Sequence, residues 1–461
     1  MPLDELKNSL TGRRMRVIFI CLMLVCAYLV WNSVTPSRAD PLTDQDRAEM
    51  IDSVASVFVD RYVYPEMGMQ MDSMLKSNLA NGVYDNDSSL SDFTQSISDD
   101  LRELSNDLHI RVNPIPENRF YVVEGQKITE EQIFLKSLEN FGWGKLEWLP
   151  GAVGYIKIDK FEDVAYAGKI AEAALSFMAN SHAIIIDLRD HHGGHENMQR
   201  LVASYFFNEP TQLSSLYWTY LDSLDEAWTS TDISGSSLAG KDLYILVSNQ
   251  TASGAEAFAY NMKHQGNATI VGEKTAGAAH WSDWYEFPKL GLVAHVPVAR
   301  PINPVTQTSW EGTGVIPDIL APAGKAFDKA YLEAVLNLET KSADKRIKRF
   351  LNWLVPTVEA RLNPVHLDKG LASKYTGNYL YSDGEKQCSI RYESGNLVYI
   401  NSIGEKSNLI PMTEDLFRFE EEHDEYGEIR IKFVLDESGA VTEFHLIDII
   451  GLMDKRTWIN N

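Results

Sequence analysis

Cysteine is scarce in this chain: 461 residues contain three. Two of them, Cys21 and Cys26, fall within one apolar run near the N-terminus, which leaves Cys388 alone in the remaining sequence. A single cysteine cannot form an internal disulfide framework. A lone thiol without a basic partner is also a poor nucleophile. The sequence therefore directs the search for chemistry to other residue types.

Positive charge is also scarce. The chain has 42 Lys and Arg against 65 Asp and Glu, a formal net charge of −23. Such a field repels nucleic acid and anionic lipid, so we expect no nucleic-acid partner and no polybasic membrane contact. The ordinary hydrophobic fraction of 44%, with 29 Gly and 17 Pro, excludes collagen-like, low-complexity and polytopic membrane proteins. At about 100–200 residues per domain, the length allows two to four domains.

One apolar run, residues 17–31, interrupts this polar pattern. A basic segment precedes it, and a polar stretch ending in small residues follows it up to Asp40, which is typical of a secretory signal. The run is shorter than the roughly 18 residues of a confident spanning helix. We expect residues 1–39 to be a signal peptide, with an uncleaved signal anchor as the alternative. The protein would then be exported, periplasmic or extracellular, and would meet the membrane only through an uncleaved 17–31.

Three patterns of hydrophobicity divide the rest. Residues 41–109 carry apolar positions at helical spacing. From Gly154 short apolar runs alternate with helical stretches, which predicts an α/β domain with a mostly parallel sheet covered on both faces. From about Leu371 alternating strands and tight turns predict a small all-β barrel or sandwich, an accessory domain. The expected boundaries are 40–150, 151–365 and 366–461.

The clearest chemical signal is the segment Thr251–Glu256, which follows the apolar strand Leu243–Val247. A serine at a strand-to-helix turn projects its hydroxyl above the sheet edge. The next amide, that of Gly254, lies at a helix N-terminus, where it can stabilise an oxyanion. The alternative is that Ser253 only caps the helix, with Glu256 completing a capping box.

A second chemical signal lies at the end of another predicted strand, in the segment Asp187–Gly194. Paired glycines there let the backbone approach a ligand closely, and one of their amides could be a second oxyanion donor. The alternative is a turn that needs positive φ. The nearby histidines have no cysteine and no convincing partner spacing, so no metal site is predicted. They are His191, His192 and His195.

A serine nucleophile needs a base, and the base needs an orienting partner. His109 stands alone among polar residues, and Glu311 is unremarkable by itself. No spacing argument brings these distant residues together. Reasoning from the residues alone therefore ends at a candidate nucleophile.

Four motifs follow one another over roughly residues 154–318: Asp187-Leu188-Arg189 with Gly193-Gly194, Thr251–Glu256, Gly272-Glu273-Lys274-Thr275, and Glu311-Gly312 with Gly314-Val315 and Pro317-Asp318. In this order they resemble the motifs of the S41 family of serine peptidases. That family includes the C-terminal processing proteases, the tricorn core and the interphotoreceptor retinoid-binding modules. Segments of the N-terminal region, including Asp107-Leu108-His109-Ile110, resemble the last of these. The resemblance implies an α/β catalytic domain of the ClpP/crotonase-like type behind an N-terminal helical subdomain.

The resemblance also implies residue roles. Processing proteases use a lysine base in a Gly-Lys-Gly triplet, which here reads Gly277-Ala278-Ala279. The tricorn-like branch uses a histidine and a glutamate, whose positions hold His109 and Glu311. The implied machinery is Ser253 as nucleophile, His109 as general acid and base, and Glu311 orienting the histidine or its network. The implied oxyanion donors are Gly254 and either Gly193 or Gly194, and no cofactor or metal is implied. His191 replaces the family's usual asparagine beside these glycines.

Substrate selection differs from that of the processing proteases. The stretch between Arg111 and Gly154, about 40 residues, is too short for their PDZ domain, so we expect the cleft or the tail domain to select a peptide or unfolded protein. One alternative is a non-catalytic binder of an apolar small molecule or peptide, and another is an interaction module that docks through its β tail. The sequence predicts no oligomeric state. In the small-molecule or peptide binder, aromatic residues would line the pocket: Trp281, Trp284, Tyr285 and Phe287.

Overall fold

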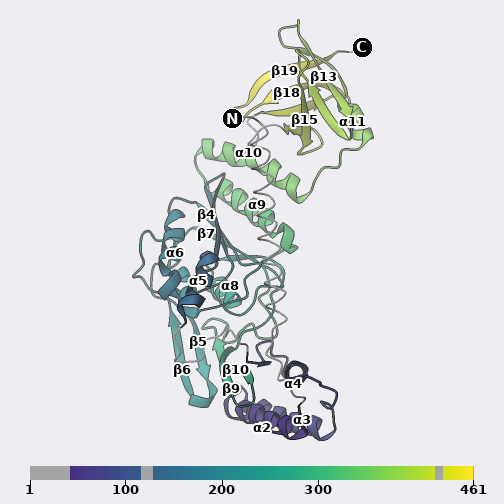
Figure 1. Cartoon of the computed structure of the whole chain (residues 1–461). Helices are drawn as coiled ribbons and strands as arrows, with labels where there is room; N and C mark the ends of the chain where they lie inside the picture. Colours follow the sequence, from purple (N-terminus) through teal and green to yellow (C-terminus); the bar gives the residue numbers. More distant parts are fainter. Residues whose placement is uncertain (1–41, 116–127, 421–428, 460–461) are drawn as a thin grey trace, which may run out of the picture.

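The structure is a computed structural model that describes residues 42–115, 128–420 and 429–459 (Figure 1). The expected signal peptide or anchor, with its apolar run, lies outside the described residues. Among those described, no helix combines the length and the apolar character needed to cross a bilayer.

Three helices form the predicted N-terminal helical region: α2 (Asp44–Arg61), α3 (Pro65–Ala80) and α4 (Leu90–Ser105). Thr43 caps α2 in a capping box, and the Ser89 side chain accepts the Asp92 amide at the start of α4. Asn106 ends α4 in the left-handed conformation, at φ 57°. That turn reverses the chain and presents the next residues, from Asp107 onward, to the rest of the molecule.

A six-stranded sheet forms the centre of the α/β domain, in the order β11-β8-β7-β4-β3-β2. All its pairings are parallel except that of β2 with β3. The predicted mostly parallel sheet is therefore confirmed. The strands are β2 (Trp143–Leu149), β3 (Val153–Ile158), β4 (Ala183–Asp187), β7 (Asp242–Val247), β8 (Thr269–Gly272) and β11 (Ile319–Leu320).

Helices cover both faces of this sheet. Alternate strand residues such as Ile184 and Ile186 pack with α6 to α8, whereas Ala183 and Ile185 pack with α9 and α10. This alternation follows from side chains pointing to opposite faces along a strand. The helices are α6 (Val164–Phe177), α7 (Glu196–Ser204), α8 (Gly254–His264), α9 (Ala323–Lys341) and α10 (Lys345–Leu362).

A second, antiparallel sheet joins the helical region to the α/β domain (Figure 1). Its longest strand, β10 (Leu292–Ile302), pairs with β9 (Trp281–Phe287) on one side and with β1 (Arg111–Pro114) and β5 (Gln212–Trp218) on the other. Sequence reasoning missed β5 and its partner β6 (Ser223–Trp228), which form a hairpin. The short helix α5 (Glu130–Leu138), with no buried residue, and the 3₁₀ turns Asn140–Gly142 and Thr219–Leu221 complete this part.

The C-terminal domain is a closed antiparallel barrel of eight strands, preceded by the short helix α11 (Lys369–Tyr375). This confirms the all-β prediction and decides between barrel and sandwich. Tyr379, Phe417, Phe433 and Phe444 fill its interior. The strands are β12 (Gly377–Tyr381), β13 (Gln387–Glu393), β14 (Asn396–Ile400), β15 (Lys406–Pro411), β16 (Leu416–Phe419), β17 (Arg430–Leu435), β18 (Val441–Ile447) and β19 (Leu452–Ile459).

Candidate active site

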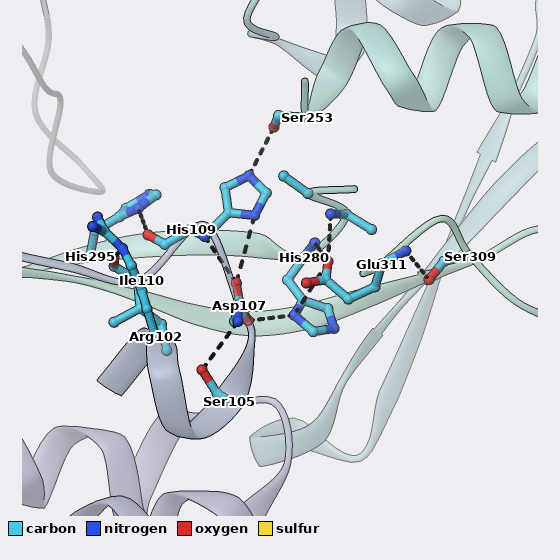
Figure 2. Close-up of polar contacts among 12 residues, drawn as sticks. Arg102, Ser105, Asp107, His109, Ile110, Ser253, His280, His295, Ser309 and Glu311 are labelled. Carbon is cyan, nitrogen blue, oxygen red and sulfur yellow. Dashed lines mark hydrogen bonds and ion pairs between the residues drawn. The ribbon is translucent and has the colours of Figure 1, made fainter. Parts of the chain in front are cut away.

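The N-terminal helical region and the α/β domain meet at a serine and a histidine. His109 Nε2 lies 3.1 Å from Ser253 Oγ, within hydrogen-bond distance (Figure 2). His109 lies between α4 and β1, and Ser253 immediately precedes α8. The pairing thus joins residues 144 positions apart, which the sequence could relate only through the resemblance.

Ser253 occupies a sharp turn between β7 and α8. Its φ of 54° and ψ of −121° are unusual for a residue with a side chain. A buried carboxylate braces the turn, because Glu256 accepts the Ser253 amide at 2.9 Å and the Gly277 and Ala278 amides at 2.7 and 2.9 Å. Ser253 is therefore the N-cap residue of α8, as the capping alternative expected, and it also presents Oγ to a histidine.

The glycine turn after β4 packs directly against Ser253. A Cβ on Gly193 would lie 2.8 Å from Ser253 Cβ and 2.9 Å from the Gly254 nitrogen. The Gly193 amide donates to His191 Nδ1 at 2.9 Å, so His191 supplies the side-chain acceptor of this turn. Burial lowers the pKa of His191 to about 3, which keeps that nitrogen free of a proton. Of the two glycines predicted as oxyanion donors, Gly193 therefore already donates its amide hydrogen bond to His191.

The three histidines around this turn do not converge. The His192 ring faces the Gln250 carbonyl at 3.1 Å, and His195 Nδ1 lies 3.8 Å from Asp163. Each ring, including that of His191, meets a different partner. Their arrangement offers no common set of ligands for a metal ion.

Asp107 lies directly behind His109. Its Oδ1 accepts the His109 backbone amide at 3.0 Å and lies 4.0 Å from His109 Nδ1. Its Oδ2 accepts the Tyr62 hydroxyl at 3.1 Å and faces His280 Nδ1 at 2.6 Å. The carboxylate is thereby held from both sides. Sequence reasoning quoted Asp107 within a motif but assigned it no role.

Glu311 contacts His280, the side chain that follows Asp107 in this network. Its Oε2 accepts the Ala279 and His280 amides at 2.5 and 3.2 Å, and it lies 3.7 Å from His280 Nδ1 (Figure 2). The structure thus places Glu311 beside His280 and not against His109. His280 was missed entirely. The available signal was its position, immediately after the triplet in which the processing proteases carry their lysine.

Burial and charge set different protonation states along this series. Burial lowers the pKa of His109 to about 4, so its ring is neutral at pH 7. Burial alone would raise the pKa of Asp107 and lower that of His280, but their hydrogen bond and mutual attraction reverse both shifts. Burial and the nearby Asp107 charge raise the pKa of Glu311 to about 7, against the opposing effect of His280.

Three of these side chains also carry atoms of the kind that bind metal ions, and one such atom from each lies within 4.8 Å of the others. They are Asp107, His280 and Glu311. Ligands about 2.0–2.2 Å from a tetrahedral ion are separated by roughly 3.4 Å. The distance of 2.6 Å between Asp107 Oδ2 and His280 Nδ1 is shorter and matches a charge-assisted hydrogen bond. A shared proton accounts for this geometry.

The aromatic residues of the binder alternative lie along β9. Successive side chains of a strand point to opposite faces, so Trp284 is directed away from Trp281, Tyr285 and Phe287. Trp284 packs on His295 with ring centroids 4.2 Å apart, whereas Tyr285 and Phe287 pack on the core of the helical region. These four residues therefore do not line one pocket.

Comparison with known proteins agrees with the motifs. The model of peptidase family S41 matches residues 152–321, and the model described as the N-terminal domain of Peptidase_S41 in eukaryotic IRBP matches residues 43–135. Together they span more than half of the chain. The chain belongs to peptidase family S41. The family match thus includes both parts that meet at Ser253 and His109.

Similar curated proteins include a carboxyl-terminal-processing protease of Picosynechococcus sp., 26% identical over 224 residues, which are 47% of this chain and 51% of that protein. The chloroplastic carboxyl-terminal-processing peptidase 2 of Arabidopsis thaliana is 26% identical over 46% of this chain and 39% of its own length. This chain thus spans about half or less of the length of these relatives.

Among solved structures, the photosystem II D1 C-terminal processing protease is similar at a TM-score of 0.39, with 15% identity over 61% of this chain and 94% of that one. The tricorn protease is similar at a TM-score of 0.40, with 11% identity over 64% of this chain and 37% of that one.

Proposed function

We propose that the protein is an exported serine peptidase that hydrolyses peptide bonds through an acyl-enzyme intermediate. The observation that carries the proposal is the 3.1 Å contact between His109 Nε2 and Ser253 Oγ. Membership of family S41 and the turn before α8 support it. Ser253 is the nucleophile, His109 the general acid and base, and Glu311 belongs to the network behind the histidine.

The neutral state of the His109 ring at pH 7 suits the first step. A neutral imidazole accepts the Ser253 proton as Oγ bonds to the scissile carbonyl carbon, and it returns that proton to the leaving amine as the C–N bond breaks. Water then hydrolyses the ester by the same route. The Gly254 amide at the start of α8, with Gly194 in the adjoining turn, would stabilise the oxyanion. No cofactor or metal takes part in this scheme.

The substrate we propose is an extended peptide or an unfolded protein. The strong net negative charge of −23 disfavours nucleic acid and favours neutral or basic peptides. Export would follow from residues 1–39, as a cleaved signal or as a membrane anchor.

The direct test is cleavage of fluorescein-labelled casein, an unfolded substrate, by the purified protein. We expect wild-type protein to release soluble fluorescence, and the variants Ser253→Ala and His109→Ala to lose at least about 1,000-fold of that rate. A barrel variant, His445→Gln, is the control for the purification. Casein cleavage that persists undiminished in Ser253→Ala would refute the proposal, because the activity would then belong elsewhere.

A further inference from the structure

Behind His109, three titratable side chains touch in series: Asp107, His280 and Glu311 (Figure 2). Asp107 and His280 expose only 1% and 3% of their surface. Burying such groups costs free energy unless they are paired. The proposed peptidase mechanism uses one of the three, so the role of the other two is open.

Interatomic distances show which of the two carboxylates can hydrogen-bond to His109. Asp107 Oδ1 already accepts the His109 amide and lies 4.0 Å from His109 Nδ1, a buried nitrogen with no hydrogen-bond partner among the described residues. Glu311 instead accepts two backbone amides and faces the His280 ring. A small rotation of the His109 ring would close the Nδ1–Oδ1 gap, and such tightening on substrate binding is common in enzymes.

We propose that Asp107 is the carboxylate that orients His109, and that His280 is a positioning residue that holds Asp107 in place, with Glu311 at the far end of the series. The inference rests on the proposed function. The proton from Ser253 Oγ moves to His109 Nε2 and on to the leaving amine. His280 and Glu311 exchange no proton with the substrate, and Asp107 stays ionised while it balances the His109 imidazolium.

The surroundings of His280 support this assignment. Its Nδ1 donates to Asp107 at 2.6 Å. Burial disfavours both charges, but this hydrogen bond and the mutual attraction lower the pKa of Asp107 and raise the pKa of His280, which favours an imidazolium–carboxylate pair. The other groups acting on the pair are His109, the Tyr62 hydroxyl, the Tyr64 ring 5.5 Å away, Arg300 and Glu311. Arg300 opposes the charge on His280, whereas Asp107 and Glu311 favour it.

Isosteric variants separate the two acids. We would measure the rate at which a fluorophosphonate probe labels the full chain, from pH 5.5 to 8.5. We expect Asp107→Asn to slow labelling roughly 100-fold or more at every pH, because a misoriented histidine is a poor base. Glu311→Gln should slow labelling at least about tenfold less than Asp107→Asn does near pH 6, where the Glu311 carboxyl is mostly protonated.

His280→Gln should slow labelling about tenfold, and its matched control is His445→Gln. His445 is also paired with a carboxylate, Glu443 at 2.8 Å, but lies in the barrel. The proposal is overturned if Glu311→Gln slows labelling as much as Asp107→Asn at every pH. It is equally overturned if His280→Gln matches the control. Circular dichroism spectra establish that each variant is folded.

A second readout does not need an active enzyme. In protein with ¹⁵N-labelled histidine, the His280 ring should remain protonated at pH 7 in the wild type and become neutral in Asp107→Asn. If wild type is never labelled by the probe but His280 behaves in this way, the proposed function fails while the charged pair stands. A His280 ring that is neutral at pH 7 in the wild type overturns the inference, whatever the labelling shows.

Discussion

Ser253 combines a strained backbone with a polar partner on each side. Positive φ at a residue with a side chain costs on the order of 1–3 kcal/mol and persists where the surroundings impose it. Here Glu256 holds the amide and His109 approaches the hydroxyl. Strain of this kind is typical of a nucleophile on a strand-to-helix turn, and a simple helix cap does not need it.

The strain itself can be measured. Because glycine adopts positive φ without a Cβ penalty, Ser253→Gly should be more stable than Ser253→Ala by about 1 kcal/mol, although both remove the hydroxyl. Urea denaturation at pH 7 gives the difference. Equal stability, or a more stable alanine variant, would show that the turn is relaxed.

Residues of this site differ in how far the sequence could predict them. Ser253 and Gly254 followed from the strand, turn and helix pattern, which is local. His109 and Glu311 came only from the family resemblance. The contact of His109 with Ser253 spans 144 positions and that of Glu311 with the His280 amide spans 31, and neither leaves a local pattern in the sequence. His280 was missed for the same reason, since its partner Asp107 lies 173 positions away. A lone histidine in a loop carries no signal until the fold is known.

At the scale of elements, two turns determine the geometry of the site. The turn after β4 must lie flat against the turn before α8, which leaves no room for side chains. A Cβ on Gly193 would lie 2.8 Å from Ser253 Cβ, and a Cβ on Gly194 would collide with the carbonyl oxygen of Phe161, in the segment between β3 and α6. Sequence reasoning predicted the paired glycines and the alternation of strands and helices, because both are periodic or compositional. It missed the β5–β6 hairpin, where β6 is largely exposed and lacks a clear apolar alternation.

The close fit predicts the effect of one methyl group. Gly194→Ala should destabilise the protein by more than about 2 kcal/mol and lower the labelling rate, because Phe161 and the turn must move apart. Gly240→Ala is the matched control: its φ of +81° is also positive, but a Cβ there meets nothing within 4 Å. Unfolding midpoints and labelling rates of both variants check this. Equal effects would mean that backbone strain, and not the close contact with Phe161, explains the need for glycine at position 194.

At the scale of the whole molecule, three largely buried histidines are held neutral. Burial lowers the pKa of His109 to about 4 and those of His191 and His295 to about 3. Between pH 6.5 and about 4 the unfolded chain therefore binds more protons at these sites than the folded chain. Stability must fall as pH decreases through that window, by up to about 1.4 kcal/mol per histidine and pH unit. The pKa of Glu311 is raised, so in this window the folded chain binds more protons at Glu311 than the unfolded chain does. This offsets part of the loss of stability.

A single substitution tests this pH dependence. His191→Asn keeps a side-chain acceptor for the Gly193 amide but removes the titrating ring. We expect its stability to fall less steeply than that of wild type between pH 6.5 and 4.5, measured as urea midpoints at several pH values. An unaltered slope in His191→Asn would mean that its ring does not contribute.

The barrel meets the α/β domain through a buried arginine. Arg430 of β17 stacks on Trp353 of α10, with its guanidinium 3.7 Å from the ring centroid, and donates to Thr357 at 3.1 Å. The described catalytic candidates all lie outside the barrel. Arg430→Met should therefore lower the unfolding temperature while the folded protein keeps its labelling rate. A labelling rate reduced tenfold or more in the folded variant would instead connect the barrel to the site.

If His109 activates Ser253 as a nucleophile, a serine-directed probe must form its covalent adduct on Ser253. The wild-type protein is treated with a fluorophosphonate, digested and mapped by mass spectrometry. We expect one phosphonylated residue, Ser253, and we expect its adduct to form at least about 100-fold more slowly in His109→Ala. An adduct on another residue, or none while a control hydrolase reacts fully, would contradict this expectation.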